Sequence, residues 1–485
     1  MASSRKRQPA TEAVESALLA AVRAAVEAAI QQGAASGDSA GATNRRTPRS
    51  EPLAIAFSGG RDSTALLDLA VRLREARVRG FRELIAVHVH HGLVAAADDW
   101  VEHCRRVCAR WSVPLDVRRV QVAVRGRGPE AAAREARYAA LAEAAREHGA
   151  RLVLTAHHLD DRLETFLIQW LRGAGPEGLA GMPPLRSLGE VRIVRPLLDV
   201  ARSDIDRYVT LRNLEYVDDP SNRDVRLLRN ALRQKQILPA LEAMRPGMRN
   251  AAARSIDLIA EAADVLRECG AVDLAACTAG APQGMLHLDR LARLTPARQA
   301  LVLRQWLASH GIEAIARARL RDLLAQALTA RADAKLVLRV GNLEVRRHRG
   351  LLLVRPVQRA ASGEAIIRWR GEPAIAVPAW RGVLRFVAGV EQGFDAEWLA
   401  ERPLELRGRT GGERFKPHPT RPSKTLKRLF QEAGIPEFER ARLPLVWRGE
   451  HLIYVAGLGA DARLVDAGGA RVQLQWQPDA PLLDA

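Results

Sequence analysis

The chain is poor in cysteine and aromatic residues and has no long apolar run. Four cysteines in 485 residues are too few for a disulfide framework, and none of them forms a Cys-x-x-Cys pair. No stretch of about 18 apolar residues occurs, so we expect no membrane span. The basic N-terminus is not followed by a compact apolar segment, which argues against a secretory signal. These absences favour a globular protein of the cytoplasm.

Lysine is also scarce, whereas arginine and alanine are abundant. The net charge of +18 and a pI near 10.8 favour a polyanionic partner. GC-rich coding would enrich the same two residue types, so part of the charge has that simpler origin. A local cluster of basic residues would favour a polyanionic partner, because coding bias alone would not concentrate them in one segment.

Basic residues cluster near the C-terminus with almost no acid among them. Three of the few lysines fall at residues 414–428, and GC-rich coding does not favour lysine. The cluster therefore predicts contacts with nucleic-acid phosphates. Its members are Arg414, Lys416, His418, Arg421, Lys424, Lys427 and Arg428.

The length predicts several domains. Residues 1–50 combine a helix over 11–31 with a polar linker. Over 51–245, apolar strands at 53–57, 84–88, 115–120 and 151–155 alternate with helical segments. This alternation predicts an α/β fold with a doubly wound parallel sheet, which binds ligands at the carboxyl ends of its strands.

The second half of the chain has a different pattern. Residues 246–357 are mainly helical and end in a β meander, 358–399 form a β-containing connector, and 400–485 form a small α+β domain. Within this last domain we expect the basic cluster to be a helical insert.

A glycine turn between the first strand and the next helix predicts a phosphate-binding loop. Its residues are Ser58, Gly59, Gly60, Arg61, Asp62 and Ser63. A strand that turns on glycine into a helix aims free N–H groups and the positive helix end at one point. No Gly-Lys-Ser/Thr follows, which excludes the Walker A form. The pattern instead resembles the loop of the ATP-pyrophosphatase (PP-loop) family, which cleaves ATP between its α and β phosphates.

Two carboxylates lie at the start of another helix. Asp161 and Glu164 stand at i and i+3 after the strand at 151–155, near the positive helix end. Such a pair can hold Mg²⁺ against ATP phosphates or receive an ammonium group. Ordinary first-turn acids are the simpler alternative.

Three weaker patterns accompany these two. The strand ending at His88, His90 and His91 lines the nucleotide pocket more plausibly than it binds a metal, because no Cys or carboxylate stands nearby. Arg229 begins a basic helix that could neutralise developing phosphate charge. A third helix carries Glu130, Arg134, Arg137 and Tyr138 on one face, for which a solvated charged face is an equally good explanation.

Taken in this order, the segments resemble the tRNA(Ile)-lysidine synthetase branch of the PP-loop family. The resemblance covers most of the chain from Leu53 onward, and its most specific part is the Arg-Gly-x-Gly-Pro-x-Gly-Leu string at 172–179. Residues 406–415, 426–430 and 443–446 resemble the C-terminal tRNA-binding domain of that branch. Residues 10–50 match nothing family-wide, and 416–422 hold more proline than usual.

The resemblance implies an enzyme that uses ATP to adenylate C2 of the anticodon cytidine in tRNA(Ile), after which the ε-amino group of free lysine displaces AMP. It implies ATP binding by the loop residues and His91, and Mg²⁺ binding by Asp62 and Asp161. It implies catalytic roles for Asp62, Asp161, Glu164 and Arg229. The tRNA-binding residues would be Arg414, Lys416, Arg421, Lys424, Lys427 and Arg428. A homodimer is left open.

The alternative functions are a tRNA thiolase and an RNA-binding protein without catalytic activity. A tRNA thiolase of the same family would need a sulfur-carrying cysteine or an iron–sulfur site, for which Cys-x-x-Cys is absent. A catalytically silent RNA-binding protein would have no use for both an intact phosphate loop and the acidic pair.

Overall fold

The computed structural model describes residues 7–35, 51–90, 97–121, 129–218, 228–312, 315–329, 336–357, 363–467 and 469–479. The chain forms two compact units, Met1–Leu266 and Arg267–Ala485. Among these residues, no helix has the length and apolar character needed to cross a lipid bilayer.

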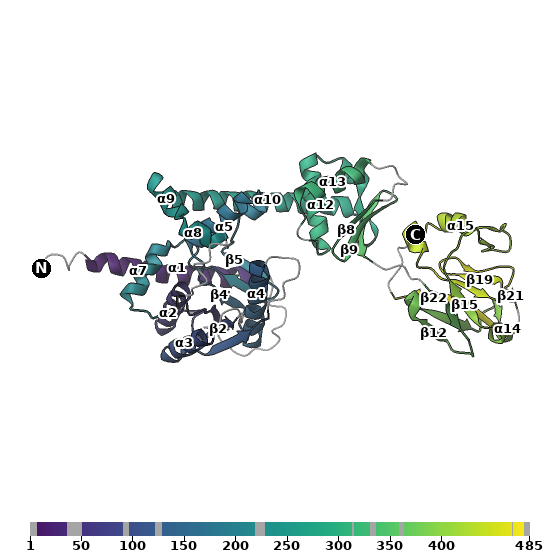
Figure 1. Cartoon of the computed structure of the whole chain (residues 1–485), viewed down its shortest axis with the longest axis horizontal. Helices are drawn as coiled ribbons and strands as arrows, with labels where there is room; N and C mark the ends of the chain where they lie inside the picture. Colours follow the sequence, from purple (N-terminus) through teal and green to yellow (C-terminus); the bar gives the residue numbers. More distant parts are fainter. Residues whose placement is uncertain are drawn as a thin grey trace. The chain divides into compact units, whose positions relative to one another are not determined.

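The first unit is built on a six-stranded sheet in the order β3-β2-β1-β4-β6-β5. Figure 1 labels β2, β4 and β5 of this sheet and the helices α2, α3 and α4 of the same unit. Neighbouring strands are parallel except at β5, which runs antiparallel to β6. The doubly wound parallel sheet expected from the sequence is therefore confirmed. The strands are β1 (Leu53–Ala56), β2 (Leu84–His90), β3 (Leu115–Arg119), β4 (Leu152–Leu154), β5 (Leu185–Leu188) and β6 (Val191–Val194).

Helices cover both faces of this sheet. Successive side chains of a strand point to opposite faces, and here the apolar ones on both faces are buried. Leu53, Ile55 and Phe57 pack into one core with α1 (Arg7–Ala35), α2 (Arg61–Glu75), α3 (Ala97–Arg110) and α7 (Arg202–Leu211). Ala54 packs on the opposite face against α4 (Pro129–Glu147). The phosphate loop begins directly after Phe57, at the carboxyl end of β1.

The N-terminal helix α1 is part of the first core. Leu18, Val22 and Val26 are buried there, and α1 contacts α2 and α7. Gly80 has a φ of +90°, and a Cβ at that position would lie 3.0 Å from Ile30 Cδ1. Glycine thus permits the close approach of the helix. Residues 7–35 therefore complete the apolar cover of the sheet.

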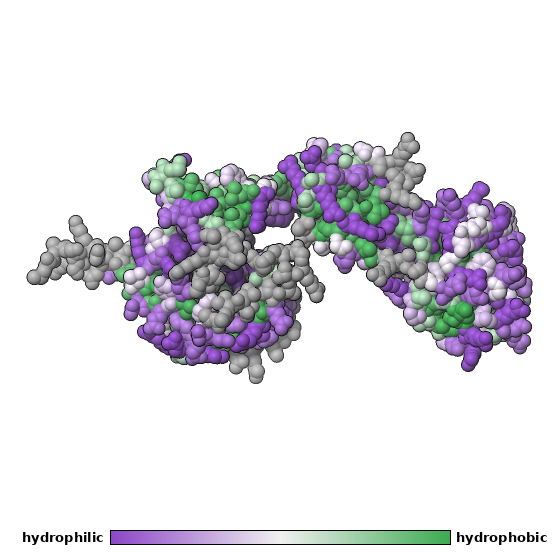
Figure 2. Space-filling view, in the orientation of Figure 1, coloured by the Kyte–Doolittle hydropathy of each residue, from purple (hydrophilic) through white to green (hydrophobic). Residues whose placement is uncertain are grey.

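A second group of helices follows the strand ends. It comprises α5 (Leu159–Leu171), α6 (Pro176–Leu179), α8 (Leu228–Gln234), α9 (Ile237–Met244) and the long α10 (Met248–Thr278). Leu159, Leu163, Leu238 and Ile256 form a small core of their own. Figure 2 shows hydrophobic surface around α9 and α10, where Met244 and Leu258 are exposed.

The second unit begins within α10 and continues with three helices packed on a four-stranded sheet. The helices α11 (Leu288–Ala292), α12 (Pro296–Ser309) and α13 (Arg317–Thr329) bury Trp306. The predicted meander is confirmed by the antiparallel pairs of β8 (Val337–Val340), β9 (Leu343–His348) and β10 (Leu351–Pro356). The short β7 (Leu286–His287) pairs with β10.

The remaining strands form two five-stranded sheets, β11-β15-β18-β19-β20 and β12-β13-β22-β14-β21, around one core. Strands from 365–395 thus pair with strands from the end of the chain. The first sheet contains β11 (Ala365–Ile367), β15 (Leu404–Arg407), β18 (Leu445–Arg448), β19 (His451–Val455) and β20 (Gly459–Ala460). The second contains β12 (Ala374–Val377), β13 (Gly382–Ala388), β14 (Gln392–Asp395), β21 (Asp466–Ala467) and β22 (Arg471–Pro478). Helices α14 (Ala396–Glu401), α15 (Leu426–Glu432) and α16 (Glu437–Arg440) connect them.

The basic cluster is only partly helical, contrary to the expectation of a helical insert. It starts with β16 (Arg414–Phe415), passes through a proline-rich turn, pairs back as β17 (Lys424–Thr425) and becomes helical at α15. Three prolines at 417, 419 and 422 remove backbone donors and restrict φ. The helix α15 accordingly begins only after the last of these prolines, at Leu426.

Candidate functional site

The phosphate loop turns directly from β1 into α2. Gly60 caps the helix, and Thr64 N donates to Gly60 O at 2.9 Å as the first helical bond. The amides of residues 61–63 precede that bond and are free for a ligand by the geometry of a helix start. Ser58 Oγ lies 3.0 Å from Ser63 Oγ, so the two hydroxyls close the turn. The loop has the shape of an anion site.

Gly59 and the segments beside it fix the loop. Its φ of +79° favours glycine, and a Cβ there would lie 3.0 Å from Cys104 Sγ. Val217 N donates to Gly59 O at 2.9 Å. On the neighbouring strand β2, the ring of His88 contacts Phe57 O at 2.9 Å. The loop is thus held from three sides.

The Arg61 side chain turns away from the loop. It pairs with Asp206, and its guanidinium lies 5.3 Å from the centre of the Tyr216 ring. Only the backbone amide of Arg61 is therefore positioned for a phosphate.

His158 connects the loop to the acidic helix α5. Its Nε2 lies 3.7 Å from Asp62 Oδ2 and 3.5 Å from Asp161 Oδ2. Asp161 N donates to His158 Nδ1 at 3.4 Å, and His158 N donates to Asp161 Oδ2 at 3.2 Å, which is a reciprocal cap of the helix. The structure therefore brings together Asp62 and Asp161, which are 99 residues apart in the chain.

Two arginines of α8 face the acidic pair. Arg233 donates to Asp161 Oδ1 at 2.6 Å and to Glu164 Oε1 at 2.7 Å. Arg229 donates to Thr165 Oγ1 at 2.7 Å, and its Nε lies 3.7 Å from Glu164 Oε2. Sequence reasoning selected Arg229 but missed Arg233, although the i, i+4 spacing puts both on one helix face. It also missed His158 as a connecting residue.

The three carboxyl groups at the site differ in the direction in which their pKa values are shifted. Burial alone would raise the pKa of Asp161, but His158 and the two guanidiniums hold that pKa at about 2. Burial raises the pKa of Glu164 in spite of the Arg233 hydrogen bond. Burial also raises the pKa of Asp62, and the charge of Asp161 adds to this effect. The three carboxylates thus form a coupled cluster in which Asp161 is the most firmly ionised.

The site has the donor set expected for a cation bound together with a phosphate ligand. Asp62 Oδ1 and Glu164 Oε2 are buried and have no hydrogen-bond partner. Mg²⁺ in nucleotide sites needs only one or two carboxylates, since phosphates and water fill the other positions. Among the described residues, no group of three or more His, Cys, Asp or Glu gathers as a metal site. His91, predicted to bind ATP, lies outside the described residues.

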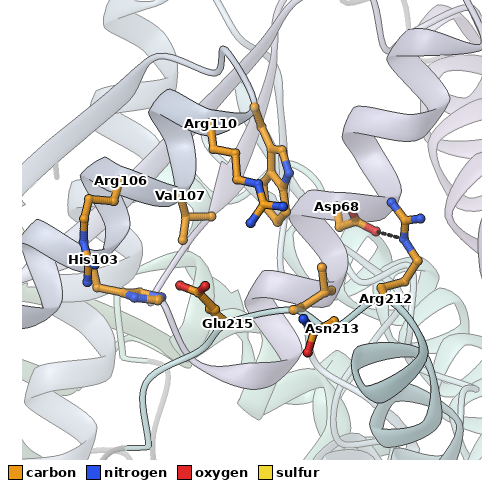
Figure 3. Close-up of a pocket in the computed structure, with 10 residues that line it drawn as sticks. Asp68, His103, Arg106, Val107, Arg110, Arg212, Asn213 and Glu215 are labelled. Atoms are coloured by element: carbon orange, nitrogen blue, oxygen red, sulfur yellow. Dashed lines mark hydrogen bonds and ion pairs between the residues drawn. The ribbon is translucent and has the colours of Figure 1, made fainter.

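A separate pocket lies between α2, α3 and the segment that follows α7 (Figure 3). Its volume is about 150 Å³, and its lining includes His103, Arg106, Arg110, Arg212 and Glu215. None of the predicted site residues lines it. It is therefore distinct from the site formed by the loop and the acidic helix.

The predicted tRNA-binding residues lie together on the hairpin β16–β17 and on α15. Arg414, Arg421, Lys427 and Arg428 are exposed, and Lys416 and Lys424 are half-buried. Lys424 Nζ lies 2.7 Å and Arg428 Nε 3.2 Å from Glu432 Oε1, an acid just beyond the cluster. Part of the local charge is thus neutralised within the protein.

The fold and the loop define an ATP-using enzyme of the PP-loop class. A family model described as the PP-loop domain matches residues 37–241. Models described as the TilS substrate binding domain and the TilS substrate C-terminal domain match residues 286–353 and 404–476.

Curated relatives show to which family within the PP-loop class the chain belongs. The tRNA(Ile)-lysidine synthase of Ralstonia nicotianae is 45% identical over 436 residues, which are 88% of this chain and 92% of that protein. The synthase of Pseudomonas aeruginosa is 40% identical over 87% of this chain and 93% of its own length. The one from Escherichia coli O157:H7 is 36% identical over 90% and 99%. This chain belongs to the tRNA(Ile)-lysidine synthase family.

Among solved structures, the U34-tRNA thiolase NcsA from Methanococcus maripaludis is similar to part of the chain. It is 16% identical, with a TM-score of 0.41, over 52% of this chain and 80% of that one. Similarity at this level does not extend to function.

Proposed function

We propose that this protein joins the ε-amino group of free lysine to C2 of the wobble cytidine in tRNA(Ile) with a CAU anticodon. ATP first adenylates the cytidine oxygen at C2 and releases pyrophosphate. The lysine ammonium first loses one proton to solvent, the free amine attacks C2, the C–O bond to AMP breaks, and the new C–N linkage releases a second proton. The product pairs with AUA instead of AUG.

The observation that most supports this proposal is the connection through His158. Its Nε2 lies within 3.7 Å of carboxylates from both the phosphate loop and the acidic helix. A ligand held by the loop amides would therefore lie beside Asp161 and Glu164. Positioning of this kind can supply roughly 7–11 kcal/mol of barrier reduction.

Each residue has a role that follows from its chemistry. The amides of residues 61–63 would bind the phosphates that leave as pyrophosphate. Asp62 and Asp161 would hold Mg²⁺, which offsets phosphate charge when bound. Asp161 and Glu164 would orient the lysine ammonium, and Arg229 would stabilise the negative charge of the adenylate.

Arg233 has a further role in this scheme. Its guanidinium bonds both carboxylates at 2.6 and 2.7 Å, so it occupies the position expected for a cationic substrate. Binding of lysine would exchange one cation for another at the acidic pair. The carboxylates would then remain paired in both states, which avoids leaving a buried charge uncompensated.

In the C-terminal region, the basic hairpin and α15 would bind tRNA phosphates. Exposed guanidinium and ammonium groups position a nucleic acid without reading its sequence. Recognition of the anticodon would need contacts to unstacked bases.

The experiment that tests the proposal uses purified protein with ATP, Mg²⁺ and labelled lysine. Isoleucine tRNA with a CAU anticodon should gain label and release one AMP per lysine joined. Methionine tRNA, which carries the same anticodon, should gain little. Absence of label, or AMP release without lysine incorporation, would contradict the proposal.

A further inference from the structure

The pocket between α2, α3 and the segment that follows α7 has fixed walls. Arg74 of α2 donates to Trp111 O at 2.6 Å, which joins the end of α3 to α2. The third wall, residues 212–215, begins at the end of α7, where Asn213 has a φ of +48° and forms the left-handed cap that asparagine tolerates. Val217 N, just beyond this wall, donates to the phosphate loop at 2.9 Å. The cavity of about 150 Å³ is therefore preformed, as ligand pockets usually are.

One acid of the pocket is already balanced within the protein. Asp68, which is 2% exposed, accepts hydrogen bonds from the Tyr208 hydroxyl and from Arg212 Nε. In the part of the chain that the structure describes, the charged side chains that line the pocket without a hydrogen bond or an ion pair are Arg106, Arg110 and Glu215. Two positive charges and one negative charge are therefore left for a ligand.

The two arginines repel each other. Arg106 and Arg110 lie one turn apart on one face of α3, and like charges at this spacing destabilise a helix. The helix dipole favours a cation at Arg110, in the last turn, but its effect falls off within that turn and does not compensate for Arg106. A ligand carboxylate on each guanidinium would remove the repulsion, because the guanidinium fork matches two carboxylate oxygens.

His103 gives the pocket a buried polar atom without a partner. The residue is 7% exposed, and its Nε2 has no hydrogen-bond partner. Burial and the charge of Arg106 lower the pKa of His103 against the opposing effect of Glu215, so the ring is neutral and one of its nitrogens is a donor. In Figure 3 the His103 ring and the Glu215 carboxylate point toward each other. A buried polar atom left unpaired calls for an explanation, and a polar ligand group beside it supplies one.

We propose that this pocket binds a small acidic amino acid, a molecule with two carboxylates and one ammonium group. The carboxylates bind the guanidiniums of Arg106 and Arg110, and the ammonium binds Glu215, so that each free charge of the pocket meets an opposite one. A cavity of about 150 Å³ holds a molecule of roughly the size of benzene. The carbon chain of such a ligand therefore fits inside, while its carboxylates reach the exposed ends of the two arginines.

The charge balance distinguishes this pocket from the lysine site of the proposed function. Free lysine carries one carboxylate and two ammonium groups, which is the opposite of what Arg106, Arg110 and Glu215 require. The pocket also shares no residue with the site formed by the loop and the acidic helix. The proposal therefore stands independently of the lysine-transfer reaction.

The test titrates L-glutamate and L-aspartate into the full-length protein, in a buffer free of phosphate and carboxylates. The readout is the NMR signal of the His103 ring, identified by its absence in His103→Gln, because it reports on this pocket alone. We expect a saturable shift in the millimolar range or below. Succinate, which lacks the ammonium group, and L-lysine should bind at least about tenfold more weakly by the same readout.

Two variants test the charge pairing. Arg110→Met should weaken L-glutamate about tenfold. Arg105→Met is the matched control and should change nothing, since Arg105 is exposed on the same helix, pairs with Glu102 at 3.4 Å and does not line the pocket. Glu215→Gln should weaken L-glutamate but not succinate. A merely structural role of Glu215 would not discriminate between the two ligands.

Three results would overturn the proposal. They are a His103 signal that neither acidic amino acid shifts, equal affinities for L-glutamate and succinate in the wild type, and wild-type affinity for L-glutamate in a folded Arg110→Met variant. Because lysine transfer is not measured here, none of these results bears on the proposed function.

Discussion

The site at the phosphate loop and the basic cluster of the C-terminal region use charge in opposite ways. At the loop, Asp161 and Glu164 are buried and each is bonded by Arg233. In the basic cluster, Arg421 and Lys427 are exposed. Buried, paired charges give large effects when one partner is removed, whereas exposed charges are screened by salt and give small ones. We therefore expect the chemistry to depend on the first region and the affinity for RNA to be spread over the second.

The largest expected effect is the loss of turnover in Asp161→Asn. The change removes one acid of the pair and leaves Arg233 and Arg229 less compensated. Lysine transfer should fall by at least about a hundredfold, and tRNA affinity should stay nearly unchanged. Asp199→Asn is the control, since Asp199 is an exposed partner of Arg162. Equal loss of transfer and tRNA binding would contradict the assigned role.

The second effect concerns pH and stability. The pKa of Asp161 is about 2, below the ordinary aspartate value of 3.8, so its ionised form stabilises the folded state. This contribution, about 2 kcal/mol, is present above pH 3.8 and is lost as the pH falls towards 2. The free energies of unfolding of the wild type and Asp161→Asn should therefore converge in acid. A difference that stays constant from neutral pH down to the pKa of Asp161 would argue against ion pairing.

A smaller effect is expected for Gly59→Ala, measured against Gly149→Ala. Both glycines have positive φ, +79° and +71°, but only a Cβ at Gly59 meets a neighbour, Cys104 Sγ at 3.0 Å. Each variant should lose about 1 kcal/mol of stability for the backbone conformation alone. Gly59→Ala should in addition weaken ATP binding. Similar ATP affinities in the two variants would contradict the role of the loop in ATP binding.

The smallest effect belongs to the basic cluster. Arg421→Ala combined with Lys427→Ala should weaken tRNA binding about threefold to tenfold, and the slope of log affinity against log salt should fall by roughly 0.7–0.9 for each phosphate that the variant no longer neutralises. Turnover at saturating tRNA should not change. Arg370→Ala, an exposed arginine of the same unit, serves as the control. A hundredfold loss of turnover at saturating tRNA would contradict the assignment of the chemistry to the phosphate-loop site and of RNA affinity to the basic cluster.

Local patterns predicted much of the fold and part of the site. The apolar strands at 53–57 and 84–88 and the glycine turn after the first are short-range features, so the sheet and the loop could be inferred directly. Asp161 and Glu164 were visible because they share one helix face. The meander at 336–354 was equally local, since its strands follow one another along the chain.

The rest depends on contacts between distant segments. Nothing local indicates that His158 contacts Asp62, or that Arg233 bonds both acids, because α8 reaches α5 only through the tertiary fold. Arg195 follows β6 and donates to the hydroxyl of Tyr138 on α4, a contact between distant segments, so the sequence left open whether that helix face is merely solvated. The apolar pattern of α1 predicted a helix, but only the structure shows that Leu18 and Val22 belong to the core of the sheet.

The central claim is that the phosphate loop and the acidic helix act on one bound substrate. A double-mutant cycle of Asp62→Asn and Asp161→Asn, read out as single-turnover AMP formation at saturating ATP and tRNA, tests it most directly. Residues that act as a unit show strongly non-additive losses. We predict that the double variant is scarcely slower than the slower single variant. Losses that multiply would mean that the two carboxylates work independently, and would contradict the account.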